Sequence, residues 1–108
     1  NHFFAAGPNG LAINASYFVN VERNAKTIVR LLKQKQQAGI NALMVKQTVS
    51  DTYNQALALQ FSRFSWGASN CNSYYRTATG HAPFLFPGSF KEYNALHNQC
   101  SLNSFEAV

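Results

Sequence analysis

The stretch NHFFAAGPNGLAINASYFVNVERNAKTIVRLL, residues 1–32, decides the fold. It predicts an apolar strand over Phe3–Ala6, a tight turn over Gly7–Gly10 and a long amphipathic helix after the turn. In open α/β sheets, a turn of this kind lies at the carboxyl end of a strand, and the next helix points its N-terminus at a bound nucleotide. The chain contains one such unit and no Gly-x-Gly-x-x-Gly fingerprint. We therefore predict a piece of a larger nucleotide-dependent protein, and we expect Asn1 to be an artificial or processing boundary.

Two helices are predicted in the first 63 residues. The first extends to about Gln37, because apolar residues recur at helical spacing and Gly39 suits a left-handed cap. Its apolar stripe consists of Ile13, Tyr17, Val21, Ala25, Ile28 and Leu32, widened by Phe18 and Val29. The opposite face carries Asn20, Arg23, Asn24, Lys26, Thr27 and Lys33. A short strand or an extended connector over Ala42–Lys46 and a second helix over Gln47–Arg63 follow.

The second half of the chain is less regular. Residues 68–88 sustain neither a helical nor a strand period, which predicts a long aromatic loop. Ser89 and Glu92 have the spacing of a capping box, which predicts a short helix to about His97. We expect Ser101–Val108 to be a frayed tail.

The composition bounds the partners of the chain. Charged residues make up 12% of the 108 residues, against nine Phe and five Tyr, so we expect an apolar face that is exposed or packs on another domain. The net charge of +5 is compatible with nucleic acid, a membrane surface or an anionic cofactor. Only Arg76 lies among the aromatic residues of the loop, so we predict no nucleic-acid partner. No apolar run approaches the roughly 20 residues of a membrane-spanning helix, so we predict no membrane partner.

Cysteine and histidine usage favours a reducing compartment. No signal-like segment precedes Cys71 and Cys100, so we predict a cytoplasmic protein. In that reducing compartment the two cysteines would be free thiols, and a disulfide between them is the alternative. Together with His81 and His97 they leave a Cys2His2 metal set as an alternative, but there is no Cys-x-x-Cys pair and we predict no metal. Residues 14–16 match a glycosylation sequon that we expect to be unused. No nucleophile and base can be paired from the sequence, so we predict no catalytic residue.

Two ordered groups of residues carry a resemblance to a known family. The first group consists of Gly7, Pro8, Asn9, Ser16 and Glu22, around the start of the long helix. The second group consists of Trp66, Cys71, Ser73, Tyr75, Arg76, Gly80, Pro87 and Gly88. In this order they resemble the C-terminal region of class B flavin-dependent monooxygenases, above all the Baeyer-Villiger type and its 4-hydroxyacetophenone monooxygenase-like relatives.

The resemblance covers nearly the whole chain and implies an enzyme with two Rossmann-like domains, which hold FAD and NADPH. Such an enzyme inserts one oxygen atom from O2 into a ketone or a soft heteroatom through a C4a-peroxyflavin. The resemblance implies that Phe3–Ala6 is the last strand of the FAD domain and that Gly7, Pro8 and Asn9 line the cofactor. The substrate pocket that it implies consists of Leu11, Asn14, Ser16, Tyr74, Tyr75 and Arg76.

Together these observations predict an α+β fold, mostly α, as a fragment of an α/β FAD-binding Rossmann-like domain. Residues 1–38 would form the strand, turn and helix, residues 39–67 the second-helix region, and residues 68–108 the aromatic loop and last helix. The chain alone is expected to be inactive, and its partners would be the missing N-terminal FAD and NADPH domains of a parent enzyme. The unpaired strand Phe3–Ala6 also predicts a homodimer. The alternative is a free-standing protein-interaction module without catalysis.

Overall fold

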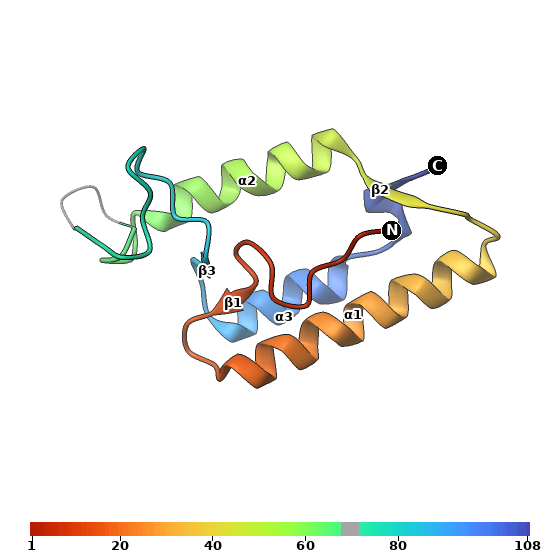
Figure 1. The fold of residues 1–108 in the computed structure, drawn as a ribbon, viewed down its shortest axis with the longest axis horizontal. Coiled ribbons are helices and arrows are strands. Elements are labelled where there is room, and N and C mark those ends of the chain that lie inside the picture. The colour runs from red at the N-terminus through yellow and green to blue at the C-terminus, as the bar shows by residue number, and fades with distance from the viewer. Residues whose placement is uncertain (68–71) are drawn as a thin grey trace.

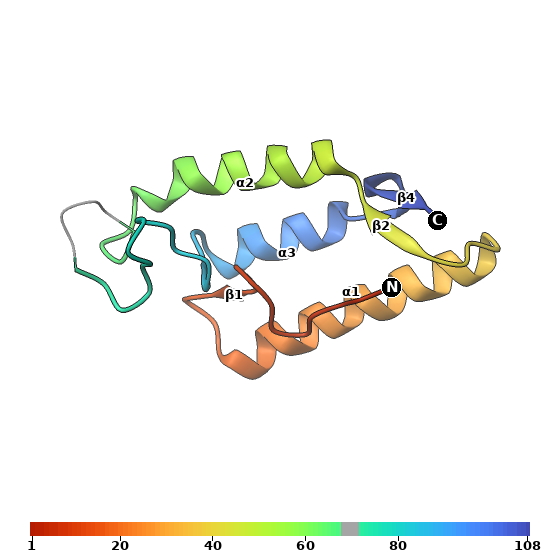
Figure 2. The ribbon, with the colours of Figure 1, turned by 45° about the horizontal axis from the view of Figure 1, so that its top comes forward.

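A computed structural model describes residues 1–67 and 72–108 (Figure 1). Its elements are β1 (Leu11–Ala12), α1 (Tyr17–Gln37), β2 (Leu43–Val45), α2 (Gln47–Phe61), β3 (Leu85–Phe86), α3 (Phe90–Gln99), the 3-10 helix η1 (Leu102–Ser104) and β4 (Phe105–Ala107). Figures 1 and 2 show α1 and α2 along opposite long edges of the molecule, with α3 between them. The described part is a small α+β fold, as predicted. Its strands form two separate two-stranded sheets, so a Rossmann-like sheet is not confirmed.

Both ends of α1 follow from local sequence signals. Ser16 is the N-cap residue, and its hydroxyl accepts a hydrogen bond from the Val19 N–H at 3.3 Å. The helix ends at Gln37, and Gly39 follows with a φ of 65°, so the predicted end and the left-handed glycine are confirmed.

The face that α1 buries is not its apolar stripe. The buried residues of α1 are Asn20, Asn24, Thr27 and Leu31. Asn20 is fully buried. Its amide group can lie away from water since its Oδ1 accepts from the Ala12 N–H at 2.9 Å and its Nδ2 donates to the Ser16 carbonyl at 3.0 Å. Three polar residues predicted to face away from the apolar stripe therefore lie in the buried face of α1 together with Leu31, while much of the stripe is exposed.

The predicted strand over Phe3–Ala6 is wrong, because these residues have no ladder partner. A single extended segment leaves its backbone groups unpaired, whereas a strand needs a neighbour. The chain instead pairs β1 in parallel with β3, with Leu11 opposite Leu85. The homodimer stays a prediction, but the unpaired strand over Phe3–Ala6 on which it was based is not present.

The C-terminal residues form a second sheet. Of the two alternatives predicted for Ala42–Lys46, a short strand and an extended connector, the structure shows the strand, β2, which pairs antiparallel with β4 and places Val45 opposite Phe105. The expectation of a frayed tail over Ser101–Val108 is therefore wrong. Backbone hydrogen bonds of 3.2 and 2.9 Å between Ala42 and Val108 extend this pairing to the last residue.

The core lies where α2, α3 and the loop before α3 meet β1. One cluster consists of Ala12, Leu57, Phe86 and Tyr93, and a second consists of Trp66, Ala82 and Leu85. The loop predicted over residues 68–88 was expected to contain no strand, but it ends in β3, which belongs to this core. Phe61, the last residue of α2, packs against both clusters. The second helix therefore exists as predicted, but it ends at Phe61, two residues before the predicted Arg63.

The capping box predicted for α3 is present. The Ser89 N–H donates to Glu92 Oε2 at 2.6 Å, and the Glu92 N–H donates to the Ser89 hydroxyl at 3.2 Å. The Ser89 N–H and the Ser89 hydroxyl, which donates to Glu92 Oε2 at 2.9 Å, hold the pKa of the Glu92 carboxyl below its usual value. The helix runs to Gln99 and places Tyr93 in the core.

Candidate functional site

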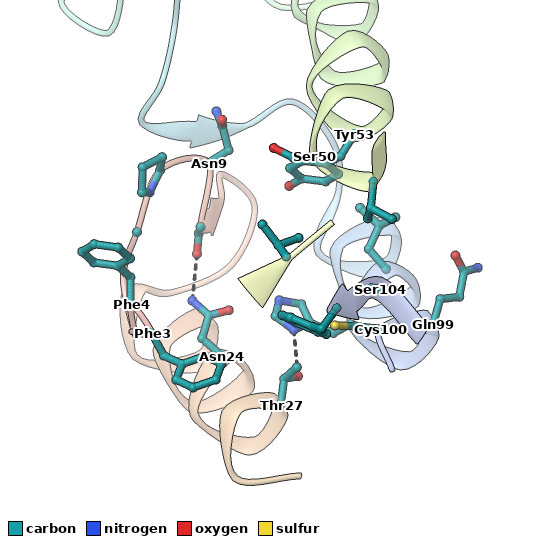
Figure 3. Close-up of a pocket in the computed structure, with 18 of the residues that line it drawn as sticks. Phe3, Phe4, Asn9, Asn24, Thr27, Ser50, Tyr53, Gln99, Cys100 and Ser104 are labelled. Atoms are coloured by element: carbon teal, nitrogen blue, oxygen red, sulfur yellow. Dashed lines mark hydrogen bonds between the residues drawn. The ribbon is translucent and has the colours of Figure 1, made fainter. Parts of the chain in front are cut away.

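An open groove of about 1000 Å3 lies between the N-terminal segment, α1, α2 and α3 (Figure 3). Its aromatic and aliphatic lining consists mainly of Phe3, Phe4, Val45, Val49, Tyr53, Ala56, Tyr93, Leu96 and Phe105. No Asp, Glu, Lys or Arg of the described ranges lines it. A groove of this size and lining suits an uncharged, largely apolar ligand.

The Gly7–Gly10 turn forms one wall of the groove. It is closed by a hydrogen bond of 3.0 Å from the Gly10 N–H to the Gly7 carbonyl. Pro8 is followed by Asn9 with a φ of 51°, which is the left-handed conformation that a type II turn requires at its third position. A Cβ atom at Gly7 would lie 2.7 Å from the Cβ of Phe4, so the close contact of the turn with Phe4 requires glycine.

Asn9 fastens this turn to the segment before β3. Its backbone N–H donates to the Pro83 carbonyl at 2.7 Å, and its side-chain amide donates to the carbonyls of Ala82 and Leu85 at 3.1 and 2.8 Å. These bonds offset the left-handed conformation, which costs about 1 kcal/mol outside glycine. The donors of Asn9 therefore hold the fold together and are not free to bind a cofactor.

Asn24 of α1 and Tyr93 of α3 hold the turn from the helical side. The Tyr93 hydroxyl lies 2.5 Å from Asn24 Oδ1 and 2.9 Å from the Gly10 carbonyl. The Asn24 amide donates to the Ala5 carbonyl at 2.7 Å and to the Gly10 carbonyl at 3.2 Å, and Figure 3 shows one hydrogen bond from this amide to the wall of the groove. Burial raises the pKa of Tyr93 to about 12, so its hydroxyl keeps its proton and donates at neutral pH.

A second polar pair joins the same two helices. Thr27 Oγ1 lies 2.7 Å from Nδ1 of His97, which also lines the groove (Figure 3). Burial, together with the charges of Arg23 and Arg30, lowers the pKa of His97 to about 4. His97 is therefore neutral at pH 7, and with Nδ1 engaged by Thr27, Nε2 is the ring nitrogen left for a ligand.

Two arginines of α1 bind carbonyl groups near the C-terminal end of α3. Arg30 donates to the carbonyls of His97 and Cys100 at 2.5 and 2.9 Å, and Arg23 donates to the Asn94 carbonyl at 3.3 Å. Cations stabilise this end of a helix, where carbonyl groups lack partners. Cys100 lies at the groove, and burial raises the pKa of its thiol, so it is a protonated, weakly nucleophilic group there.

The structure places the predicted cofactor residues Gly7, Pro8 and Asn9 together in the groove wall. Three of the predicted substrate residues lie outside the lining of this groove. Leu11 packs against the core cluster around Trp66, Asn14 accepts a hydrogen bond of 2.7 Å from the Phe90 N–H, and Ser16 caps α1.

The other predicted substrate residues are grouped elsewhere. Tyr74, Tyr75 and Arg76 line a separate pocket of about 280 Å3 with Pro83 and Phe84. Tyr75 stacks on Phe84 with ring centroids 5.8 Å apart, while Tyr74 is 95% exposed. This pocket and the groove do not share lining residues, so the structure does not bring the two predicted sets together.

Several groove residues were not predicted from the sequence: Asn24, Thr27, Tyr53, Tyr93 and His97. A signal for two of them was present, because Asn20, Asn24 and Thr27 are spaced by four and three residues and so form a polar row along one side of a helix. A row of short amides and a hydroxyl can bind backbone groups, as well as face water.

The described residues contain no group of three or more metal-ligating side chains. Cys71, which belongs to the alternative metal set and to the alternative disulfide, lies outside the described residues. Within the described ranges, no helix has both the length and the apolar character needed to cross a membrane.

Two curated proteins are similar to this chain over 107 residues. A Baeyer-Villiger monooxygenase from Pseudomonas aeruginosa is 29% identical over 97% of the chain and 20% of the relative. The FAD-binding monooxygenase stcW from Emericella nidulans is 24% identical over 98% of the chain and 18% of the relative. No protein-family model and no solved structure matches the chain. The chain thus spans about a fifth of the curated relatives that it matches, and it is similar to part of one protein named as a Baeyer-Villiger monooxygenase and of one named as an FAD-binding monooxygenase.

Proposed function

We propose that the chain is the C-terminal part of an NADPH- and FAD-dependent monooxygenase, called here the parent. The parent would insert one oxygen atom from O2 into a ketone or a soft heteroatom. The observation that carries this proposal is the Gly7–Gly10 turn in the wall of a groove lined by no charged residue of the described ranges. The proposal is supported by the similarity to a Baeyer-Villiger monooxygenase, which is 29% identical to the chain over 97% of its length. Both dinucleotide sites would belong to the rest of the parent, because the chain carries no Gly-x-Gly-x-x-Gly sequence.

The residues present fit the ring system of FAD better than its diphosphate. A diphosphate is bound by cations or by free amides at a helix N-terminus. The described lining of the groove contains no Lys or Arg, and the amides of Asn9 and Gly10 are bonded within the chain. The flat, uncharged ring would instead contact the Gly7–Pro8 backbone and the aromatic wall, and the diphosphate would lie against the rest of the parent.

The residues of this chain would support the reaction by binding and by excluding water. FAD, reduced by NADPH, supplies the electrons for the reduction of O2 when it is bound. Phe3, Phe4 and Leu96 line the groove and would keep water from the ring. Neutral His97 offers Nε2, and Tyr53 offers a hydroxyl whose pKa is raised by burial, so that it remains a proton donor at neutral pH. Both groups can hold a neutral oxygen-bearing ligand in the groove.

The test is the intact mass and visible spectrum of the native polypeptide purified from its own cells, followed by NADPH oxidation under air. We expect a yellow protein several times longer than 108 residues that consumes NADPH continuously when O2 is present and no more than one NADPH per flavin without O2. A colourless protein, or a native chain of 108 residues, would overturn the proposal.

A variant then links this turn to the cofactor. Gly7→Val in the parent places a side chain against Phe4, where a Cβ atom alone would lie 2.7 Å from the Phe4 Cβ, so we expect lower flavin occupancy. Ala38→Val, at the exposed far end of α1, is the control and should leave the flavin content unchanged. Equal flavin content in both variants would remove the turn from the cofactor site.

A further inference from the structure

The outward side of α1 carries apolar side chains that no other described element covers. We call Phe18, Ala25, Val29 and Leu32 the outer stripe. Their spacings of seven, four and three residues place them on one side of the helix. Phe18 is 81% exposed, Val29 50% and Leu32 41%, and Ala25 is exposed as well. In Figures 1 and 2, α1 forms one long edge of the molecule.

The polarity of α1 is the reverse of that expected for a surface helix. A surface helix buries its apolar side and exposes its polar side. Here Asn20, Asn24 and Thr27 are buried, while the outer stripe is left in water. An ion pair of 2.8 Å between Glu22 and Lys26 borders the stripe, so the stripe has the apolar centre and polar rim of a protein interface.

We propose, building on the function proposed above, that the outer stripe docks on an apolar face of the remaining polypeptide of the parent. The matched segment makes up only 20% and 18% of the two relatives, so in a parent of that length most of the polypeptide would lie outside this chain. A face on the same polypeptide is present at high effective concentration and needs little affinity of its own. A second copy is a weaker candidate, because the net charge of +5 on each chain opposes self-association.

The test compares two glutamate substitutions at equally exposed apolar residues. Phe18 on the outer stripe and Leu59 on α2 are 81% and 80% exposed, and Leu59 does not line the groove. In the full-length parent, we expect Phe18→Glu to lower the thermal midpoint by several degrees and to speed proteolysis around α1. Leu59→Glu should change neither value. Both variants should leave the thermal midpoint of the 108-residue chain unchanged, because both side chains already lie in water there.

Three outcomes would overturn the docking proposal. In the first, Phe18→Glu and Leu59→Glu have equal effects on the full-length protein. In the second, Phe18→Glu converts a full-length dimer into a monomer in sedimentation, which would assign the stripe to a second copy. In the third, the native polypeptide has only 108 residues, which would overturn the proposed function as well. A long but flavin-free polypeptide that shows the expected contrast between the variants would overturn the proposed function alone.

Discussion

The hydroxyl of Tyr93 lies 2.5 Å from Oδ1 of Asn24, and this contact joins α3 to α1 beside the Gly7–Gly10 turn. Asn24 in turn donates to the Gly10 carbonyl at 3.2 Å. The wall of the groove is therefore positioned by two helices that are far apart in sequence, through side chains that are buried and polar. Buried polar groups of this kind specify one arrangement, because any other leaves them unpaired.

Removing the Tyr93 hydroxyl should weaken the fold measurably. In Tyr93→Phe, Asn24 Oδ1 loses its donor while the ring stays in the core. We expect the free energy of unfolding of the chain to fall by about 1–2 kcal/mol, measured by urea denaturation. Tyr53→Phe is the matched control, because no hydrogen bond of the Tyr53 hydroxyl occurs among the described residues, and it should change stability by less than about 0.5 kcal/mol. Equal losses in the two variants would contradict this role of Tyr93.

Asn9 should be sensitive to alanine and more tolerant of glycine. Asn9→Ala loses the amide bonds to Ala82 and Leu85 and keeps a Cβ atom at a φ of 51°, so we expect a loss on the order of 2–3 kcal/mol. Asn9→Gly loses the same bonds but adopts this φ freely, so its loss should be smaller by about 1 kcal/mol. Thermal unfolding of both variants measures the difference, and a larger loss for glycine would show that Asn9 is not strained.

Local signals predicted the helices well. The Ser89 and Glu92 spacing gave the start of α3, and Gly39 gave the end of α1, because caps and left-handed glycines act within a few residues. The Gly7–Pro8–Asn9 turn was also predicted from its composition, and it lies in the groove wall. Whether a cofactor binds there is set by residues outside this chain, under the proposed function.

The pairing of the strands could not be predicted in the same way, although local alternation over Ala42–Lys46 did mark β2. β1 pairs with β3 and β2 pairs with β4, and each pair joins segments more than 50 residues apart, so no local pattern identifies the partner of a strand. The inward side of α1 was missed for a related reason. The hydrogen-bond partners of the buried Asn20 and Asn24 are backbone groups of the N-terminal segment and the Tyr93 hydroxyl. These partners lie outside α1, so the periodicity of the helix could not predict that its polar side is buried.

This reversed polarity of α1 predicts an unusual pair of substitutions. Asn20→Leu adds an apolar side chain to a fully buried position, but it removes the partners of the Ala12 N–H and carbonyl. We expect a loss of about 2–4 kcal/mol in the free energy of unfolding of the 108-residue chain. Val29→Gln, on the exposed outer stripe, should change it by less than about 0.5 kcal/mol. Chemical denaturation of both variants checks the order, and a stabilising Asn20→Leu would show that α1 packs through its apolar side.

His97 should make the stability of the chain depend on pH between about 6.5 and about 4. Its pKa is depressed in the folded state, so between these values the unfolded state binds a proton that the folded state does not. Stability contributed by neutral His97 is complete above pH 6.5 and is lost as the pH falls towards 4, by an amount on the order of 2–3 kcal/mol. His97→Gln removes this titration, so urea denaturation at pH 7.0, 5.5 and 4.5 should show a shallower fall for the variant than for the wild type. Parallel pH profiles would mean that His97 is accessible to water and titrates alike in both states, and its place beside Thr27 and the groove would then have to be abandoned.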